Sequence, residues 1–481
     1  MHDPEVNSRA EPSEATLAGS DLHLDLSPTG SRRTALITAL RESVRSGRLA
    51  PGTRLPAYRA LAADLGIARN TVAEAYAELV AEGWLTARQG SGTRVAARTA
   101  PLKPVRVPKK TPGPAAGPRH DLRQGAPDMT AFPRSAWAAS VRRALHAAPH
   151  QAFGPGSPQG RIELRAALAE YLARVRGVRT RPECIVICAG FAHALRLLFA
   201  GSAGAGGGVL RGPLAVEAYG LGFHRGLLAD ASLVTTPLSL DEQGARVEEL
   251  DRQRAVLLTP AHQFPTGGPL VAGRRAAVVD WARGRDGLLI EDDYDGEFRY
   301  DRRPVGAVQG LDPQRVVYVG SVSKSLSPAL RLGWMVLPEH LVEPVLRAKG
   351  EREAWTGVTD QLALADFIEC GAYDRHLRRM RQRYRRRRDL LVEALAAAAP
   401  GLTVSGIAAG LHAVVELPPG TEQSVLKGAV WQGVAVDGLS EFRHPDSSMP
   451  LTDGVVVGYA APSDRAYPAA LEALVRALPP P

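Results

Sequence analysis

The chain has 481 residues, 45% hydrophobic and 23% charged, with a formal net charge of +9. This composition excludes a disordered or fibrous protein, and three cysteines are too few for a disulfide scaffold or a zinc cluster. No apolar run approaches the ~18 residues of a membrane span, and the first residues lack a secretory pattern, so we expect a cytoplasmic location. The basic balance favours nucleic acid or phosphate partners, although an arginine-rich protein without such partners would share it.

Changes in composition divide the chain into four segments. Residues 1–30 are polar and acidic, and we expect a mobile tail there. Residues 31–96 are rich in arginine and show helical apolar spacing. Residues 97–120 alternate proline with lysine and arginine, which favours an extended spacer over a packed core. Across residues 121–481, strand-like apolar runs alternate with longer helical patterns, which predicts a mostly parallel sheet covered by helices.

Apolar spacing predicts three helices in the arginine-rich segment, over Thr34–Ser46, Tyr58–Leu65 and Arg69–Glu82. Only a short turn that begins at Gly66 separates the last two, as expected of a helix-turn-helix. The third helix opens with Arg69, Asn70 and Thr71, whose side chains can donate to base edges or phosphates in a major groove.

Two short strands are predicted after the third helix, over Trp84–Ala87 and Thr93–Ala96, with a glycine-rich hairpin tip at Gly90–Gly92. Between Arg32 and Arg94 there are ten arginines and five acidic residues. An excess of positive charge in one small domain is what DNA binding requires.

This segment resembles the winged helix-turn-helix domain of the GntR family of regulators. The resemblance rests on motifs such as Gly52-Thr53-Arg54-Leu55-Pro56, Arg69-Asn70-Thr71-Val72 and Gly90-Ser91-Gly92-Thr93. It implies binding to double-stranded DNA, with contacts at Arg59, Arg69, Asn70, Thr71 and Gly92. A solvated or helix-capping role is the alternative for each of these residues.

An acidic cluster follows the predicted strand Leu288–Asp292 and extends to Glu297. Carboxylates at the carboxyl end of such a strand lie where α/β sheets bind ligands. One of them can hold the protonated ring nitrogen of a pyridoxal cofactor. A solvated acidic loop is the alternative, and the lack of a nearby histidine disfavours a metal site.

Two further polar clusters follow predicted strands. After Val316–Val319, the hydroxyls of Ser321 and Ser323 precede Lys324, and Arg331 follows, which suits a Schiff-base lysine beside a phosphate-binding site. After Ala255–Thr259, a polar turn contains His262 and Gln263 and can line the same cleft. A plain loop without a binding role is the alternative interpretation.

Together these clusters resemble the fold type I aminotransferases, and more closely the MocR subgroup of GntR regulators, which joins the two domain types. The resemblance implies an α+β winged helix-turn-helix domain followed by an α/β pyridoxal-phosphate domain, and a homodimer. It implies that Lys324 binds the cofactor covalently as the catalytic residue, Asp292 pairs with the pyridine nitrogen and Tyr294 meets the ring hydroxyl. It also implies phosphate contacts from Ser321, Ser323, Arg331, Gly190, Phe191 and Ala192, and ring-side contacts from His262 and Gln263.

Several positions depart from the subgroup's usual pattern. Where an acidic-Pro-Gly-Tyr run is usual, this chain has Glu217-Ala218-Tyr219-Gly220-Leu221, so the ring-stacking residue is open between Tyr219 and Phe223. Phe153 replaces a common tyrosine, and Ala192 a common glutamine. No motif fixes an arginine for an effector carboxylate, and Arg443 is the candidate.

Three functions fit these features. The first is a transcription regulator that senses pyridoxal phosphate, an amine or an amino acid. The second is an active aminotransferase with a DNA-binding appendage, and the third is a binding module with a structural cofactor. The fusion favours the first, because an enzyme gains nothing from an intact DNA-reading domain.

A basic helix predicted over Tyr373–Glu393 is either a solvated helix face or an additional DNA-binding surface.

Overall fold

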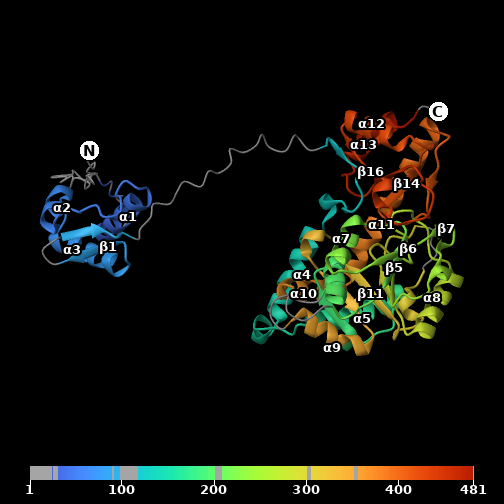
Figure 1. Ribbon diagram of the computed structural model, residues 1–481, viewed down its shortest axis with the longest axis horizontal. Coiled ribbons are helices and arrows are strands. Elements are labelled where there is room, and N and C mark those ends of the chain that lie inside the picture. The colour runs from blue at the N-terminus through green and yellow to red at the C-terminus, as the bar shows by residue number, and fades with distance from the viewer. Residues whose placement is uncertain are drawn as a thin grey trace, which may run out of the picture. The chain divides into compact units, whose positions relative to one another are not determined.

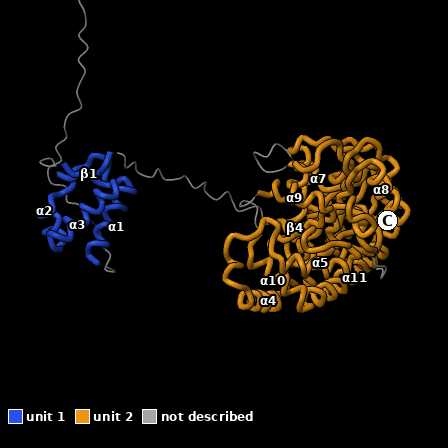
Figure 2. The backbone as a smooth tube through the Cα atoms, turned by 90° about the horizontal axis from the view of Figure 1, so that it is seen from below, with its two compact units in different colours: residues 1–115 blue, residues 116–481 orange. Residues whose placement is uncertain are grey.

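The computed structural model describes residues 24, 26, 31–88, 92–97, 118–200, 208–300, 305–350 and 356–479. The chain divides into two compact units, residues 1–115 and 116–481 (Figures 1 and 2). Most of the expected tail, the expected spacer and the predicted hairpin tip lies outside the described residues; of the tail, only Leu24 and Leu26 are described, and Leu24 is buried in the core of the first unit. Within the described part, no helix is both long and apolar enough to cross a bilayer.

The first unit contains the predicted helices and strands within a residue or two of their expected ends. They are α1 (Arg32–Arg45), α2 (Tyr58–Leu65), α3 (Arg69–Ala81), β1 (Leu85–Arg88) and β2 (Gly92–Val95). The side chain of Ser31 caps α1 by accepting from the Thr34 amide, and Gly66 ends α2 in the left-handed conformation that glycine adopts readily. Leu36, Leu40, Val72 and other apolar side chains fill its core.

A seven-stranded sheet forms the centre of the second unit, in the order β4-β12-β11-β10-β9-β5-β6. Its strands pair in parallel except at β12, which runs antiparallel to both neighbours, so the prediction of a mostly parallel sheet is confirmed. The strands are β4 (Ile185–Cys188), β5 (Leu214–Glu217), β6 (Thr235–Leu238), β9 (Ala255–Leu258), β10 (Leu288–Asp292), β11 (Val316–Ser321) and β12 (Gly333–Val336).

Helices pack on both faces of this sheet (Figure 1). Side chains alternate along each strand, so Tyr318 of β11 joins one apolar cluster while Val317 and Val319 join another. The first cluster includes residues of α5 (Ile162–Arg176), α10 (Val358–Glu369) and α11 (Ala372–Ala398), and α4 (Arg134–Ala147) packs beside α10. The second includes residues of α6 (Phe191–Leu195), α7 (Gly222–Asp230) and α9 (Glu339–Lys349), while α8 (Ala272–Arg285) covers the strands nearer β6.

A smaller sheet, in the order β13-β14-β17-β16, carries the C-terminal helices. Its elements are β13 (Val404–Ser405), β14 (His412–Glu416), β16 (Asp437–Gly438), β17 (Gly454–Gly458), α12 (Glu422–Trp431) and α13 (Tyr467–Ala477). Next to it, β3 (His120–Asp121) pairs in parallel with β15 (Val434–Ala435). Two short strands, β7 (Leu240–Asp241) and β8 (Gly244–Ala245), form a separate hairpin.

The basic helix predicted over Tyr373–Glu393 is part of α11, and its arginines are not all solvated. Arg387 is 2% exposed and donates to Asp128 and Asp464, and Arg383 contacts the same two carboxylates. Asp128 lies just before the short turn Met129–Ala131, so these ion pairs fix the start of the second unit against α11. These two arginines therefore have a structural role and are not available to a DNA track.

Candidate functional site

The predicted DNA-contact residues cluster at the start of α3 and on the neighbouring α2. Arg59, Arg69 and Asn70 are exposed, and Thr71 is half-buried because it begins to turn toward the core. No side chain caps α3, so its first amide groups are open to an acceptor such as a phosphate oxygen.

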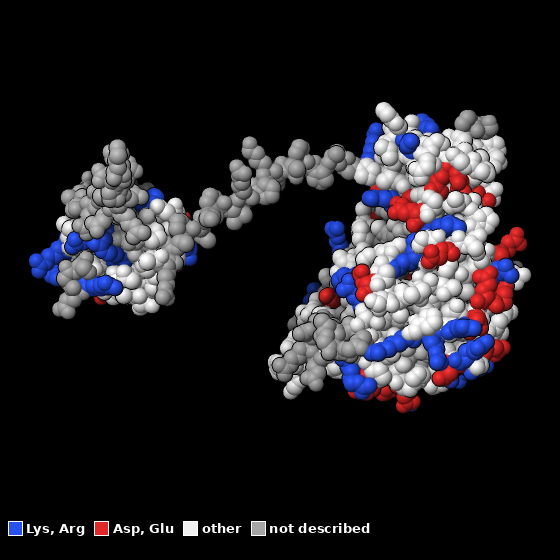
Figure 3. Space-filling view, viewed as in Figure 1, with Lys and Arg blue, Asp and Glu red and all other residues white. Residues whose placement is uncertain are grey.

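Ion pairs connect α1 to the C-terminal end of α3, away from the predicted DNA contacts. Arg33 pairs with Glu78 of α3, and Arg41 pairs with Glu82, the residue that follows α3. Among the described residues, neither Arg59 nor Arg69 has a carboxylate within 4 Å. Figure 3 shows basic side chains gathered on one face of this unit.

Gly92, the remaining predicted DNA contact, is the first residue of β2 and is exposed. Its φ is +80°, which disfavours any other residue, and an added Cβ would lie 3.2 Å from Nε of Arg54. The close approach explains why this position of the hairpin is a glycine.

A cavity of about 290 Å³ opens in the second unit at the carboxyl ends of the parallel strands. The residues that line it come from segments far apart in the sequence. Most of the predicted cofactor residues are among them: Gly190, Phe191, Ala192, Asp292, Tyr294, Ser321, Ser323, Lys324 and Arg331. The structure thus brings together the acidic cluster after β10, the serine-lysine cluster after β11 and the start of α6.

Lys324 places a half-buried amine in this cavity. Its Nζ donates a hydrogen bond to the carbonyl of Gly125, which also lines the cavity. Burial lowers the pKa of Lys324, while the negative charges of Asp295 and Asp292 oppose that shift. A lysine whose pKa is lowered supplies more of the neutral amine that attacks a carbonyl carbon.

Asp292, the last residue of β10, is 9% exposed and lines the same cavity. Burial and the charge of Asp293 raise its pKa well above the usual value, while Lys324 lowers it. A cationic N–H group placed inside the cavity would stabilise the ionised form of this buried carboxylate.

The other acids of the acidic cluster have structural roles. Asp293 accepts two hydrogen bonds from the buried guanidinium of Arg176 and one from the hydroxyl of Tyr318. Glu291 accepts from the amides of Val308 and Gln309. Both carboxylates therefore join neighbouring segments of the fold and do not line the cavity.

One end of the cavity is rich in groups that bind an anion. Gly190 has a φ of +99° and turns the chain from β4 into α6, so the amides of Phe191 and Ala192 lie at the start of a helical segment. The guanidinium of Arg331 lies beside Gly190, with Nη1 4.0 Å from the position of an added Cβ there. Ser321 and Ser323 line the same cavity, and the hydroxyl of Ser321 accepts from the amide of Ser323 at 3.4 Å.

His262 and Gln263, predicted as ring-side contacts, lie behind the cavity wall instead. His262 Nδ1 lies 2.9 Å from the hydroxyl of Tyr294 and 2.8 Å from Asp295 Oδ2. Gln263 Nε2 donates to the carbonyl of Tyr219 at 3.1 Å. The polar turn folds inward against the sheet, and these buried hydrogen bonds hold the wall residues in place.

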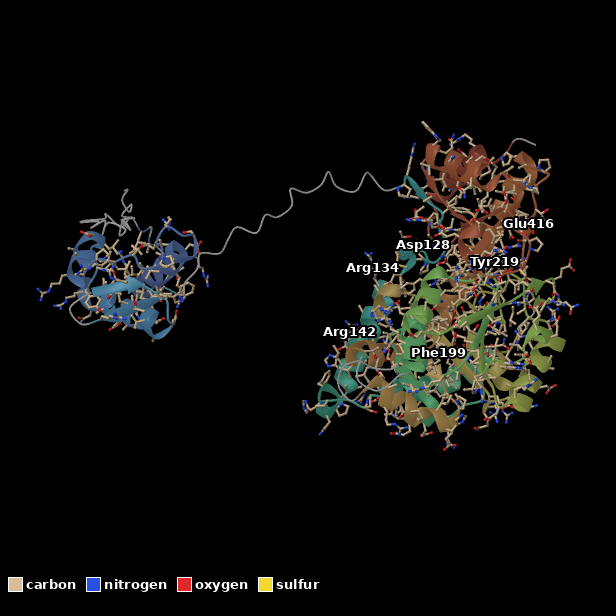
Figure 4. All side chains as sticks on the ribbon, viewed as in Figure 1. Asp128, Arg134, Arg142, Phe199, Tyr219 and Glu416 are labelled. Carbon is tan, nitrogen blue, oxygen red and sulfur yellow. The ribbon has the colours of Figure 1, made fainter. Side chains whose placement is uncertain are left out.

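Two other candidate residues, Phe223 and Arg443, do not line the cavity. Phe223, a candidate for ring stacking, is 64% exposed and outside the cavity, whereas Tyr219 is buried and lines it. Tyr219 lies where the central sheet meets the smaller one (Figure 4). Phe153 is 51% exposed and does not line the cavity. The guanidinium of Arg443, the candidate for an effector carboxylate, donates to the carbonyls of Ser447 and Met449 and does not line it.

Sequence reasoning missed several lining residues, namely Gly125, Leu221, His224, Arg225 and His412. The ring of His224 lies against that of Phe191, with centroids 4.8 Å apart. Burial and the nearby charges of Lys324 and Arg225 lower the pKa of His224 to about 4, so its ring is neutral at neutral pH. No motif marks the segment Leu221–Arg225. The run Glu217–Leu221 departs from the subgroup's usual pattern, so the sequence did not show that the following residues line the cavity.

Two family models match this chain. Residues 33–95 match the model "Bacterial regulatory proteins, gntR family", and residues 121–455 match "Aminotransferase class I and II". The second match covers more than half of the chain, from β3 to the start of β17.

Curated relatives combine the same two parts. The pyridoxine biosynthesis transcriptional regulator PdxR of Corynebacterium glutamicum is 33% identical, over 92% of this chain and 95% of its own. The probable rhizopine catabolism regulatory protein MocR of Rhizobium meliloti is 34% identical, over 88% of this chain and 89% of its own. Among solved structures, the kynurenine aminotransferase of Pyrococcus horikoshii aligns with a TM-score of 0.66 over 75% of this chain and 91% of its own, at 24% identity, which shows the fold.

Proposed function

This chain belongs to the MocR subgroup of GntR-type transcriptional regulators, and we propose that pyridoxal phosphate, or an amine or amino acid that reacts with it, controls its binding to an operator. The assignment of this chain as a transcriptional regulator follows from the family, whose members are named as helix-turn-helix transcriptional regulators. The cofactor, the effector class and the individual residue roles are the parts we propose.

The observation that carries the proposal is the set of donors and acceptors around the cavity. It combines a half-buried amine at Lys324, a buried carboxylate at Asp292, and an end at Gly190 and Arg331 that suits an anion. Pyridoxal phosphate carries the matching groups, namely an aldehyde, a protonated ring nitrogen and a phosphate. A phosphate is well bound by a guanidinium, hydroxyls and helix-start amides together.

Each residue then has a defined task. Lys324 would bind the aldehyde carbon through its amine, and Asp292 would pair with the ring nitrogen and keep that nitrogen protonated. Ser321, Ser323, Arg331 and the amides of Gly190, Phe191 and Ala192 would hold the phosphate. When bound, the cofactor supplies an electrophilic carbon that primary amines attack. Tyr294, held by His262, would orient the ring hydroxyl.

DNA binding would be carried by the first unit, through Arg59, Arg69, Asn70, Thr71 and Gly92. A ligand can change that binding only if it stabilises one arrangement of the protein over another. We propose that the protein works as a homodimer, which presents two DNA-binding domains to an operator with two half-sites.

The proposal is tested by measuring operator affinity and cofactor absorbance on the same full-length protein. We expect wild-type protein to take up pyridoxal phosphate with a visible absorbance band, and its operator affinity to change on saturation. Lys324→Ala should lose both the band and the change, while its cofactor-free affinity for the operator stays the same. A wild-type protein that remains colourless in saturating pyridoxal phosphate would refute the cofactor assignment.

Amino-group transfer is the competing activity, because Lys324 and Asp292 also permit it. Incubation with an amino acid and a keto acid distinguishes the two functions. Rapid multiple turnover, combined with operator affinity that no ligand changes, would favour the enzyme over the ligand-controlled regulator.

A further inference from the structure

Three polar side chains at the cavity wall form a cluster that the proposed function uses only in part. Tyr294 and Asp295 follow β10, and His262 lies in the polar turn after β9. Tyr294 lines the cavity, whereas His262 and Asp295 are buried behind it. The proposed function gives the carboxylate of Asp295 no task.

A single nitrogen of His262 contacts both of the other side chains. Nδ1 lies 2.8 Å from Oδ2 of Asp295 and 2.9 Å from the hydroxyl oxygen of Tyr294. A carboxylate oxygen only accepts, so Nδ1 carries a proton and donates it to Asp295. Because that proton occupies the lone pair of Nδ1, this nitrogen cannot accept from the hydroxyl of Tyr294. The phenol oxygen of Tyr294 instead accepts a share of the same N–H.

Tyr294 keeps its own proton in this arrangement. Burial, followed by the negative charges of Asp295 and Asp292, raises the pKa of Tyr294 well above its usual value of 10. The hydroxyl therefore remains a donor at neutral pH. Since Nδ1 of His262 is closed to it as an acceptor, this O–H is available to an acceptor in the cavity that Tyr294 lines.

Neighbouring segments hold the buried pair of His262 and Asp295 in place. An added Cβ on Gly410 would overlap both side chains, so the chain just before β14 packs directly on them. The hydroxyls of Tyr300 and Tyr459 both donate to the carbonyl of Gly410. Hydrogen bonds in such a desolvated cluster are stronger than in water. Further charged or titratable groups that face the cluster, among the described residues, are Asp292, Glu217, Glu297, Lys324 and His412.

We propose that Asp295 and His262 are positioning residues that keep the proton of Tyr294 directed into the cavity, so that Tyr294 acts only as a donor to the ring oxygen of the cofactor. The inference rests on the proposed function, because that oxygen belongs to bound pyridoxal phosphate. A donor at the ring oxygen stabilises negative charge there. It thereby weakens the attraction of this oxygen for the proton on the Lys324 nitrogen once that nitrogen is bonded to the cofactor. The bound group then loses this proton at a lower pH.

The experiment measures the visible absorbance of the cofactor-loaded, full-length protein against pH, which gives the midpoint of this proton loss. Tyr294→Phe removes the donor. We expect its midpoint to lie about one pH unit or more above that of wild-type protein, the size expected for the loss of one charge-assisted hydrogen bond.

Two variants of His262 differ only in where they place an amide. The side-chain nitrogen of asparagine falls near the position of Nδ1, whereas that of glutamine falls near Nε2. His262→Asn should keep the wild-type midpoint, and His262→Gln should raise it by most of the shift seen in Tyr294→Phe. Combining His262→Gln with Tyr294→Phe should add nothing to the shift of Tyr294→Phe alone, because His262 acts through Tyr294.

The matched control is Thr266→Val in the same polar turn. It removes a hydrogen bond to Gln263 but none to the cluster. We expect it to lower stability to urea without moving the midpoint. Asp295 is unsuitable for this comparison, because its charge also acts on the pKa of Lys324.

A second measurement is made on wild-type protein. Nitrogen NMR of histidine-labelled protein shows which ring nitrogens carry a proton, and the signal that is missing in His262→Asn identifies His262. We expect Nδ1 to be protonated with and without the cofactor. An unprotonated Nδ1 would overturn the proposal, even where His262→Gln did not take up the cofactor.

The possible failures are distinguishable. If the midpoint moves in Tyr294→Phe but not in His262→Gln, or moves equally in both His262 variants, the positioning role is wrong and the proposed function stands. If Tyr294→Phe leaves the midpoint unchanged, the donor role is wrong, again without affecting the proposed function. If wild-type protein stays colourless in saturating pyridoxal phosphate, the proposed function fails and this inference fails with it.

Discussion

The amine of Lys324 donates to the carbonyl of Gly125, a residue 199 positions earlier in the chain. Gly125 lies four residues after β3, the strand at which the second unit begins its described structure, and Asp128 follows it in the ion pairs with α11. The amide and carbonyl of Leu122 also bond to Ala435 and Gly458 of the smaller subdomain. The segment that enters the second unit thus crosses the cavity beside the proposed reactive amine. If the amine of Lys324 were bonded elsewhere, this hydrogen bond to the segment would be lost.

Gly125→Ala should weaken both the fold and cofactor uptake. Gly125 has a φ of +109°, and an added Cβ would lie 3.5 Å from Nζ of Lys324. We expect a loss of about 1–3 kcal/mol in the free energy of unfolding from backbone strain, and slower uptake of pyridoxal phosphate. Urea unfolding and the rise of the visible absorbance measure the two effects. Gly220→Ala, in the same cavity but with no atom near its added Cβ, should change neither greatly. Equal behaviour of the two variants would contradict the role of this segment.

The rate of cofactor uptake should rise with pH to a plateau, and the midpoint of that rise should lie below pH 10.5. Only the neutral amine of Lys324 attacks the aldehyde, and burial lowers its pKa from 10.5. Asp295 favours the charged amine, so Asp295→Asn should move the midpoint to lower pH. Stopped-flow absorbance across pH 6–10 gives the midpoint, with the exposed Asp446→Asn as a control. A midpoint that stays in place in Asp295→Asn would show that this carboxylate does not act on Lys324.

Glu217→Gln should make the cofactor-free protein more stable at alkaline pH. Burial raises the pKa of Glu217 from 4.5 to about 7, so its ionisation opposes folding as the pH rises through that range. Between the pKa values of 4.5 and about 7, each pH unit lowers the free energy of unfolding by about 1.4 kcal/mol or less. The loss is smaller than this figure because the side chain of Glu217 is partly exposed. The bonds from Thr259 and Gln263 all reach Oε2, so an amide oxygen can replace it. We expect thermal midpoints to be equal near pH 5 and higher for the variant at pH 8.5. A variant that is less stable at both pH values would show that the ionised form is favoured in the fold.

The architecture followed from the sequence more completely than the cavity did. Helices such as α3 and strands such as β10 are local features, fixed by apolar spacing and by turn residues, and both formed where expected. Lys324 and Asp292 could be predicted as cofactor residues because Asp292 ends β10 and Lys324 follows β11 by three residues, each in a dense polar cluster. Arg225 was missed because no motif marks it, and only the three-dimensional fold brings it to the cavity.

Asp293→Asn should destabilise the second unit strongly, although its neighbour Asp292 has the proposed cofactor role. Asp293 is buried against Arg176, whose side chain is 4% exposed, and a neutral amide would leave that cation without its counter-charge. We expect a loss of about 3–5 kcal/mol, measured by urea unfolding. The control is Asp241→Asn, which removes a carboxylate that is 42% exposed and leaves Arg274 paired with Glu248, so it should cost about 1 kcal/mol or less. Comparable losses in the two variants would mean that the buried pair contributes little.

Arg69→Ala should weaken operator binding with little change in the stability of the first unit. Arg69 is exposed at the start of α3 and, among the described residues, has no carboxylate within 4 Å, so its removal breaks no ion pair seen in the fold. A lost base contact costs about 1–3 kcal/mol of specific affinity, whereas a lost phosphate contact lowers the salt slope of binding by about one. Titrating operator and unrelated DNA at several salt concentrations separates these outcomes. Arg33 lies on α1 and pairs with Glu78 of α3, so Arg33→Ala should change the stability of the first unit more than its affinity for the operator. If Arg33→Ala weakened operator binding as much as Arg69→Ala did, the start of α3 would not be the reading surface.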